Sequence, residues 1–217
     1  MKPYLRLSSL LLILTAGCAS PYKHLQPLET PKNSAFIYKP QFNKALYRCI
    51  VNGNLIFKKF HLSGILLFKT MENGTVRAVF QNEMGMAFFD FEWNGQDSFK
   101  VNQVIEQLDR PAVIKTLKKD LSLLLMKGLD KKSEKFFVGD RGKSTYHCFN
   151  IESGYAYYVE TDKELVRIEN AGEKKKVITI TTTGRNIPTD MPDSVFFNHH
   201  KANFTIALQK IQTHADE

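Results

Sequence analysis

Three Asn-Gly dipeptides, each between apolar or β-branched segments, constrain the fold of this 217-residue chain more than any other feature. They are Asn52-Gly53, Asn73-Gly74 and Asn94-Gly95. Both positions of an Asn-Gly pair accept the positive φ of a type I′ turn, whose twist matches that of the strands it joins. The pattern therefore predicts successive antiparallel hairpins, with strands at about 45–51, 55–71, 75–81, 86–93 and 98–101.

One amphipathic helix is expected near the middle of the chain. Asp109 is its predicted capping residue, Pro111 suits its first turn and Gly128 ends it. Residues 102–108 are predicted as a shorter helical piece before it. The apolar face of the main helix carries Leu117, Leu121 and Leu124.

Strands resume after the helix, at about 144–151, 155–161, 165–169, 174–183 and 202–211. The last segment alternates apolar with polar or small residues, although a helix competes for it. Ser63-Gly64 lies inside the long second strand, where a bulge or bend would let the sheet curl. The fold class is therefore mainly β with some α: a curved antiparallel sheet or unclosed β-barrel, with the helical insertion packed on its concave face.

The first 20 residues have the layout of a secretory signal peptide. Lys2 and Arg6 are basic, the apolar run that follows is too short to cross a bilayer, and small residues lead to Cys18. The stretch Leu14-Thr15-Ala16-Gly17-Cys18 resembles the lipobox of bacterial lipoproteins. The resemblance implies cleavage before Cys18 and attachment of acyl chains, such as palmitate, to that residue.

The signal peptide and lipobox resemblance predict a chain of three parts. Residues 1–17 are the signal peptide, residues 18–43 a proline-rich tether, and residues 44–213 a single domain. Ala19 stands where lipoproteins kept in the inner membrane of enteric bacteria have aspartate, so the resemblance favours an outer-membrane lipoprotein facing the periplasm.

The formal net charge of +8, to which Lys2 and Arg6 contribute, suggests anionic lipid headgroups as partners. A merely solvated, lysine-rich surface remains the alternative. The sequence contains no nucleic-acid motif, so no nucleic-acid partner is expected, and it leaves the oligomeric state open.

The sequence contains no recognisable catalytic set, and we expect neither an enzyme nor a cofactor. His147 and Cys148 are adjacent in a strand and point to opposite faces, which makes them a poor nucleophile pair. His199 and His200 could bind a metal, but no third ligand has a recognisable spacing, so no metal site is predicted.

Cys49 and Cys148 both fall in predicted strands. Export permits a disulfide between them, which would close a long loop. Each could equally be a small buried hydrophobe. The sequence leaves both alternatives open.

Apolar residues share one face of each predicted strand, and a curled sheet lined this way has two outcomes. The helix either fills the hollow as a plain core or leaves a dry cavity that accepts acyl chains, since hydrocarbon needs only apolar walls. The predicted cavity walls are Phe60, Leu62, Leu66, Phe68, Phe80, Phe89 and Phe91, with Leu117, Leu121 and Leu124 as the helical cover.

The strand-rich meander and the helical insertion, together with the lipobox, resemble the LolA/LolB-like fold, and 75–91 (TVRAVFQNEMGMAFFDF) is similar to the strand pair ahead of its helix. The resemblance implies a half-barrel that holds the acyl chains of lipoproteins. Met84-Gly85-Met86 is the candidate for the protruding apolar loop of LolB.

Two functions follow as hypotheses. One is a membrane-anchored lipoprotein that binds lipid or acyl chains without catalysis, with acceptance or transport of lipoproteins as a further role. The other is a structural or interaction lipoprotein with a filled core, an accessory subunit of an outer-membrane complex.

Overall fold

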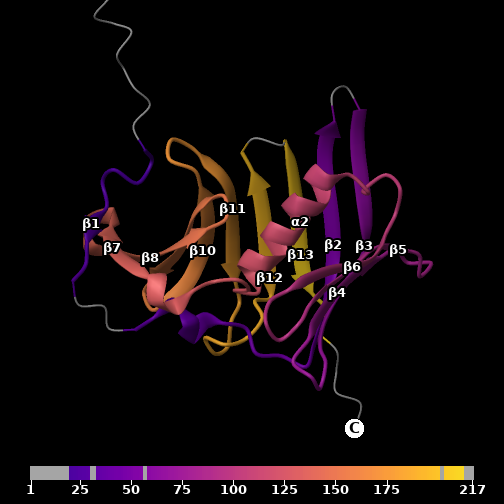
Figure 1. Ribbon diagram of the computed structural model, residues 1–217, viewed down its shortest axis with the longest axis horizontal. Helices are drawn as coiled ribbons and strands as arrows, with labels where there is room; N and C mark the ends of the chain where they lie inside the picture. The colour runs from indigo at the N-terminus through magenta and orange to yellow at the C-terminus, as the bar shows by residue number, and fades with distance from the viewer. Residues whose placement is uncertain (1–19, 30–32, 56–57, 201–202, 213–217) are drawn as a thin grey trace, which may run out of the picture.

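The computed structural model describes residues 20–29, 33–55, 58–200 and 203–212. Cys18 and the predicted signal peptide lie outside these ranges. The described residues form one antiparallel sheet of thirteen strands and one α-helix (Figure 1). The strands are β1 (Gln26–Pro27), β2 (Lys44–Leu55), β3 (Lys58–Thr70), β4 (Val76–Gln81), β5 (Ala87–Trp93), β6 (Phe99–Val104), β7 (Lys135–Gly139), β8 (Ser144–Ile151), β9 (Gly154–Thr161), β10 (Glu164–Ala171), β11 (Lys176–Thr183), β12 (Ser194–His199) and β13 (Phe204–Lys210).

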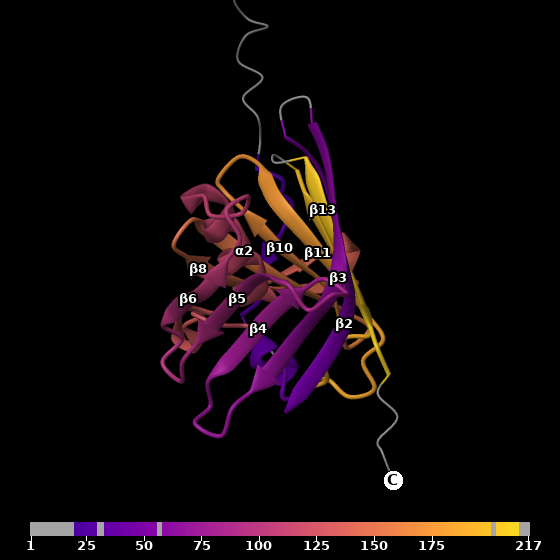
Figure 2. The ribbon, with the colours of Figure 1, turned by 90° about the vertical axis from the view of Figure 1, so that its right-hand side faces the viewer.

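Two meanders build the sheet. Strands β7 to β13 pair in sequence, strands β2 to β6 do the same, and β13 pairs with β2 to join them. Because β6 ends at one edge of the sheet and β7 lies next to the other edge, the chain between them must cross from edge to edge. It does so over the concave face and carries α2 (Pro111–Leu124) there (Figures 1 and 2). The predicted fold class is confirmed.

Turns lie at two of the three Asn-Gly dipeptides, as predicted, but neither is the expected type I′ turn, because neither dipeptide has positive φ at both of its residues. Asn73-Gly74 lies between β3 and β4, with Gly74 at φ 79°. Asn94-Gly95 lies between β5 and β6, where the positive φ falls on Asp97 instead.

The turn predicted at Asn52-Gly53 is wrong, because both residues lie within β2. Gly53 pairs with Phe60 on one side and with Phe204 on the other. A Cβ on Gly53 would lie 2.4 Å from the Phe60 ring and 2.7 Å from Phe204 Cβ. The glycine therefore serves packing between two phenylalanines rather than a turn.

The bulge predicted at Ser63-Gly64 is also wrong. These residues pair with Ile50 and Cys49 in unbroken register. A Cβ on Gly64 would lie 2.0 Å from the carbonyl oxygen of Gln81, so the close approach of another backbone explains this glycine.

Gly64→Ala is expected to lower the free energy of unfolding by about 3 kcal/mol, because the backbone at Gln81 must move to admit the methyl group. Gly95→Ala is the matched control: its nearest atom lies 3.9 Å away, so we expect a change within about 0.5 kcal/mol. Urea unfolding of both variants measures the difference, and equal losses would contradict the steric explanation.

The limits of α2 differ from those predicted. Arg110, not Asp109, precedes the helix, and no side chain caps it, while Pro111 takes the first turn as expected. The helix ends at Leu124, before Gly128, because Met126 adopts a φ of 51° that a helix cannot continue. The helical piece predicted at 102–108 is wrong, since β6 extends to Val104 and a turn follows.

The described residues of the predicted tether pack on the sheet. Residues Ala35–Tyr38 form a 3-10 helix, and the side chains at its two ends are buried. Glu134 accepts a hydrogen bond from the backbone N–H of Ala35 (2.7 Å) and another from the hydroxyl of Ser34. On the outer face, the Tyr22 ring stacks on Tyr157 with centroids 3.8 Å apart. The described residues of the predicted tether 18–43 therefore contact the domain that follows.

Candidate functional site

The concave face of the sheet brings together all ten side chains predicted to line a cavity. They belong to one apolar cluster, and eight of them are at most 8% exposed. Phe60 and Leu62 are partly exposed. The members are Phe60, Leu62, Leu66, Phe68, Phe80, Phe89, Phe91, Leu117, Leu121 and Leu124.

The helix and the turn after it fill this hollow. Trp93, Leu123, Leu125 and Met126, which were not among the predicted walls, are each at most 3% exposed. The Trp93 indole N–H donates to Ser122 Oγ at 2.9 Å. The concave face is therefore a packed core beneath α2 in this structure.

Some apolar side chains of the cluster still reach solvent at its rim. Phe60 and Leu62 on β3, Phe204 on β13, and Val113 and Ile114 in the first turn of α2 are only partly buried. Solvent thus meets hydrocarbon at the boundary between the sheet and its cover.

A buried pair of polar side chains joins α2 to β12. Asp120 Oδ2 lies 2.7 Å from His199 Nε2, and the Asp120 side chain has no exposed surface. His199 Nδ1 lies 3.1 Å from the carbonyl oxygen of Phe204 and can bond it only as a donor, so Nε2 and the carboxyl share one proton. Among the described residues, Asp120 Oδ1 has no hydrogen-bond partner.

Burial shifts the ionisation of the Asp120 carboxyl. Loss of solvent raises the pKa of the Asp120 carboxyl, while the His199 hydrogen bond opposes the rise. The pair was not predicted, although the sequence contains a signal for Asp120. Asp120 follows Leu117 by three residues and precedes Leu124 by four, so helical periodicity places it on the apolar face.

The two adjacent histidines do not form one site. His199 faces the core and Asp120, whereas His200 Nε2 lies 2.9 Å from Thr179 Oγ1. Among the described residues, no group of three or more His, Cys, Asp and Glu side chains is placed to hold a metal ion. His147 and Cys148 also diverge: His147 Nδ1 lies 3.0 Å from Glu134, and Cys148 belongs to a small cluster on the outer face.

The disulfide alternative for Cys49 and Cys148 is wrong. Both are buried free thiols, Cys49 in the concave cluster and Cys148 in the outer one. Five strands separate β8 from β2 in the sheet, while a disulfide needs Cα atoms within about 7 Å. Burial raises the pKa of the Cys49 thiol to about 12, which keeps it protonated and unreactive.

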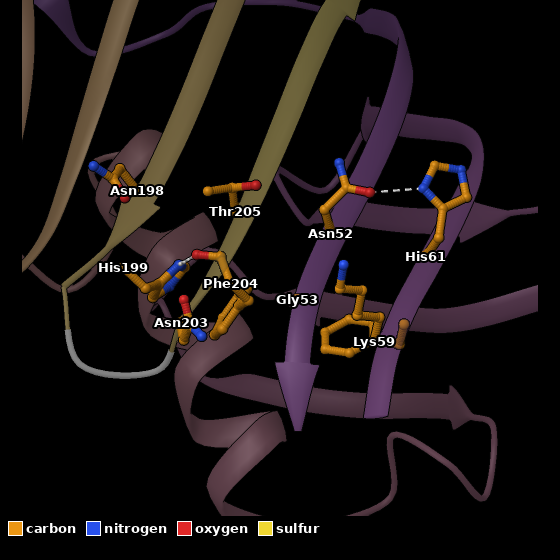
Figure 3. Close-up of a pocket in the computed structure, with 10 residues that line it drawn as sticks. Asn52, Gly53, Lys59, His61, Asn198, His199, Asn203, Phe204 and Thr205 are labelled. Atoms are coloured by element: carbon orange, nitrogen blue, oxygen red, sulfur yellow. Dashed lines mark hydrogen bonds between the residues drawn. The ribbon is translucent and has the colours of Figure 1, made fainter. Parts of the chain in front are cut away.

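A second surface feature lies on the opposite, convex face. Asn198, Thr205, Asn52 and His61 are in register on β12, β13, β2 and β3, and we call them the polar row (Figure 3). They border a shallow hollow of about 440 Å³. Asn52 Oδ1 lies 2.7 Å from His61 Nδ1.

The fold and the covered concave face define a half-barrel, an unclosed antiparallel sheet with a helix packed inside it. In the part of the chain that the structure describes, no helix is long and apolar enough to cross a membrane. No protein-family model matches the chain, and no curated protein matches it.

Three solved structures are similar to this chain, each at low sequence identity. A putative outer membrane lipoprotein-sorting protein domain from Vibrio parahaemolyticus is 8% identical, with 84% of this chain and 91% of that chain covered and a TM-score of 0.47. A LolA superfamily protein from Nitrosomonas europaea is 9% identical, with 82% and 88% covered and a TM-score of 0.45. A DUF1329 family protein from Desulfovibrio piger is 8% identical, with 78% and 84% covered and a TM-score of 0.40. Likeness this remote does not say what the chain binds.

Proposed function

We propose that this protein is a membrane-anchored envelope lipoprotein that binds lipid or acyl chains on its concave face, and that it accepts or carries lipoproteins. Acylated Cys18 would hold it at the outer membrane, facing the periplasm. An acyl chain would move from a donor protein to this one because it binds more tightly here, and this transfer needs no covalent step or cofactor.

One observation carries the proposal: a continuous apolar face is covered by α2, a helix of 14 residues, and by the turn after it. The helix covers the face with leucine side chains, which are hydrocarbon as acyl chains are. An acyl chain that displaces them regains about 0.8 kcal/mol for each CH₂ group removed from water. Movement of α2 away from the sheet would therefore exchange one apolar cover for another.

The hairpin between β4 and β5 offers a contact with the membrane. Met84 is 93% exposed and Met86 53% exposed at its tip. Asn82 Oδ1 accepts hydrogen bonds from the backbone N–H groups of both methionines, at 3.0 and 2.9 Å. The turn therefore holds two apolar side chains outward, as a surface that touches lipid requires.

Phe60→Glu is expected to weaken binding of a fluorescent fatty-acid probe at least tenfold, about 1.4 kcal/mol, because it places a charge at the apolar rim. Phe60 is only partly buried, so the variant should fold. His61→Glu is the matched control, since it adds the same charge one residue further on, on the convex face. Probe titration, with mass spectrometry of lipids extracted from the purified protein, measures both variants.

The filled hollow supports a second candidate, an interaction lipoprotein that is an accessory subunit of an outer-membrane complex. The same experiment separates the two. A protein that carries no lipid and binds no probe, or one in which both variants bind alike, contradicts acyl binding on the concave face and leaves the second candidate.

A further inference from the structure

The convex face carries a continuous strip of mostly uncharged side chains on β11, β12, β13 and β2, with the polar row at one end. Strands in a sheet are about 4.8 Å apart, so the four strands of the polar row span about 14 Å. His199 faces α2, so its neighbour Asn198 points away from the core. Figure 3 shows Asn198, Thr205, Asn52 and His61 side by side on this surface.

A second hollow, of about 310 Å³, continues the strip along the same strands. Its centre is apolar: Phe196, 44% exposed, faces outward beside Ala207, and Ile50 follows on β2. Hydroxyl and amide groups border this apolar centre. Among them, Ser194 Oγ donates a hydrogen bond to Gln209 Oε1 at 2.6 Å.

Charge is scarce along the strip, although 24% of the whole chain is Asp, Glu, Lys or Arg. Arg48 is the single such residue at the second hollow, and Lys59 is the single one at the first. The strand register places Arg48 and Lys59 six residues apart along the strands, which is about 20 Å. They therefore cannot bind one anionic group together.

Two side chains of the polar row have hydrogen-bonding groups that the protein does not use. Within the described residues, the side chains of Asn198 and Thr205 make no hydrogen bond to the protein. An amide and a hydroxyl each both donate and accept, so each matches a ligand group that does the same.

We propose that this convex strip binds an uncharged oligosaccharide. Sugar hydroxyls donate and accept as the amides and hydroxyls of the polar row do, and the apolar C–H face of a sugar ring fits on Phe196. The near absence of charge complements a neutral ligand and disfavours phosphate headgroups or nucleic acid. A protein partner is disfavoured because Phe196 is the one large apolar side chain of the strip that is exposed.

Isothermal titration calorimetry of the purified full chain tests the proposal. The ligands are two neutral sugars at millimolar concentration, maltotetraose and N-acetylchitotetraose. Asn198→Asp replaces an amide donor by a carboxylate of the same shape, and Phe196→Ala removes the aromatic floor. Asn150→Asp makes the same isosteric change at an exposed asparagine on β8, away from the strip. Thermal unfolding confirms that each variant is folded.

We expect at least one of the two sugars to bind, both strip variants to weaken that binding tenfold or more, and Asn150→Asp to change it less than twofold. Binding of neither sugar overturns the proposal. So does binding that the two strip variants leave unchanged, or that Asn150→Asp weakens equally. The strip lies on the face opposite α2, so these results do not depend on whether acyl chains bind the concave face.

Discussion

His199→Leu is expected to lower the free energy of unfolding by about 3–5 kcal/mol. The substitution leaves the Asp120 carboxyl, which has no exposed surface, without its hydrogen-bond partner. An uncompensated buried carboxyl costs far more than the net contribution of the pair, because solvation lost on folding is not replaced.

A double-mutant cycle checks this reason. Asp120→Leu/His199→Leu removes both polar groups, and we expect it to recover most of the loss, since an apolar replacement of a buried pair is often near neutral. Urea unfolding of the two single variants and the double variant supplies the coupling energy. Strictly additive losses would mean that the pair acts only through packing.

The loss in His199→Leu should also depend on pH. Burial raises the pKa of Asp120, and removal of the histidine removes a group that lowers it. An acid whose folded-state pKa lies above its unfolded value of about 3.9 contributes most stability at low pH, and this contribution is lost as pH rises through the folded pKa. The stability difference between wild type and His199→Leu should therefore shrink as pH falls towards 4.

Leu121→Ala is expected to tighten binding of the acyl probe tenfold or more while it destabilises the protein. Leu121 is 3% exposed between α2 and the sheet, so truncation weakens the cover without changing the sheet wall. Such a truncation costs about 2–5 kcal/mol. If the acyl chain enters only when α2 moves aside, a larger open fraction raises the apparent affinity in proportion.

Val159→Ala is the matched control for this second prediction. Val159 has no exposed surface, but it lies in the outer cluster, away from α2. Its truncation should lower the stability without changing the affinity. Probe titration and urea unfolding of both variants decide the matter: if Leu121→Ala binds more weakly, or if both variants gain affinity equally, displacement of α2 is not the route of entry.

Local patterns in the sequence were sufficient for most of this fold. Residue alternation and turn residues predict strands at β3, β8 and β13, and the spacing of Leu117, Leu121 and Leu124 predicts the buried face of α2. These features depend on neighbours a few residues apart, so they can be read without knowledge of the tertiary structure.

Features set by contacts between distant parts of the chain could not be predicted from such local patterns. Gly53 and Gly64 are required by close approach of other strands, not by turns of their own. Strands β7 and β12, of five and six residues, were not predicted. The position of Asp120 on the apolar face of α2 could be predicted from the sequence. Its partner His199 on β12 follows only from the path of the chain across the concave face.

The pairing of β13 with β2 has a consequence for how the chain reaches its native state. The first long strand and the final strand meet in the middle of the sheet, so neither meander can complete the shell alone. Contacts this distant in sequence form slowly, because a long loop must close before they gain anything. During synthesis, the two meanders would stay separate until β13 emerges. Loss of the C-terminal strand would then split the domain at its centre rather than trim its edge.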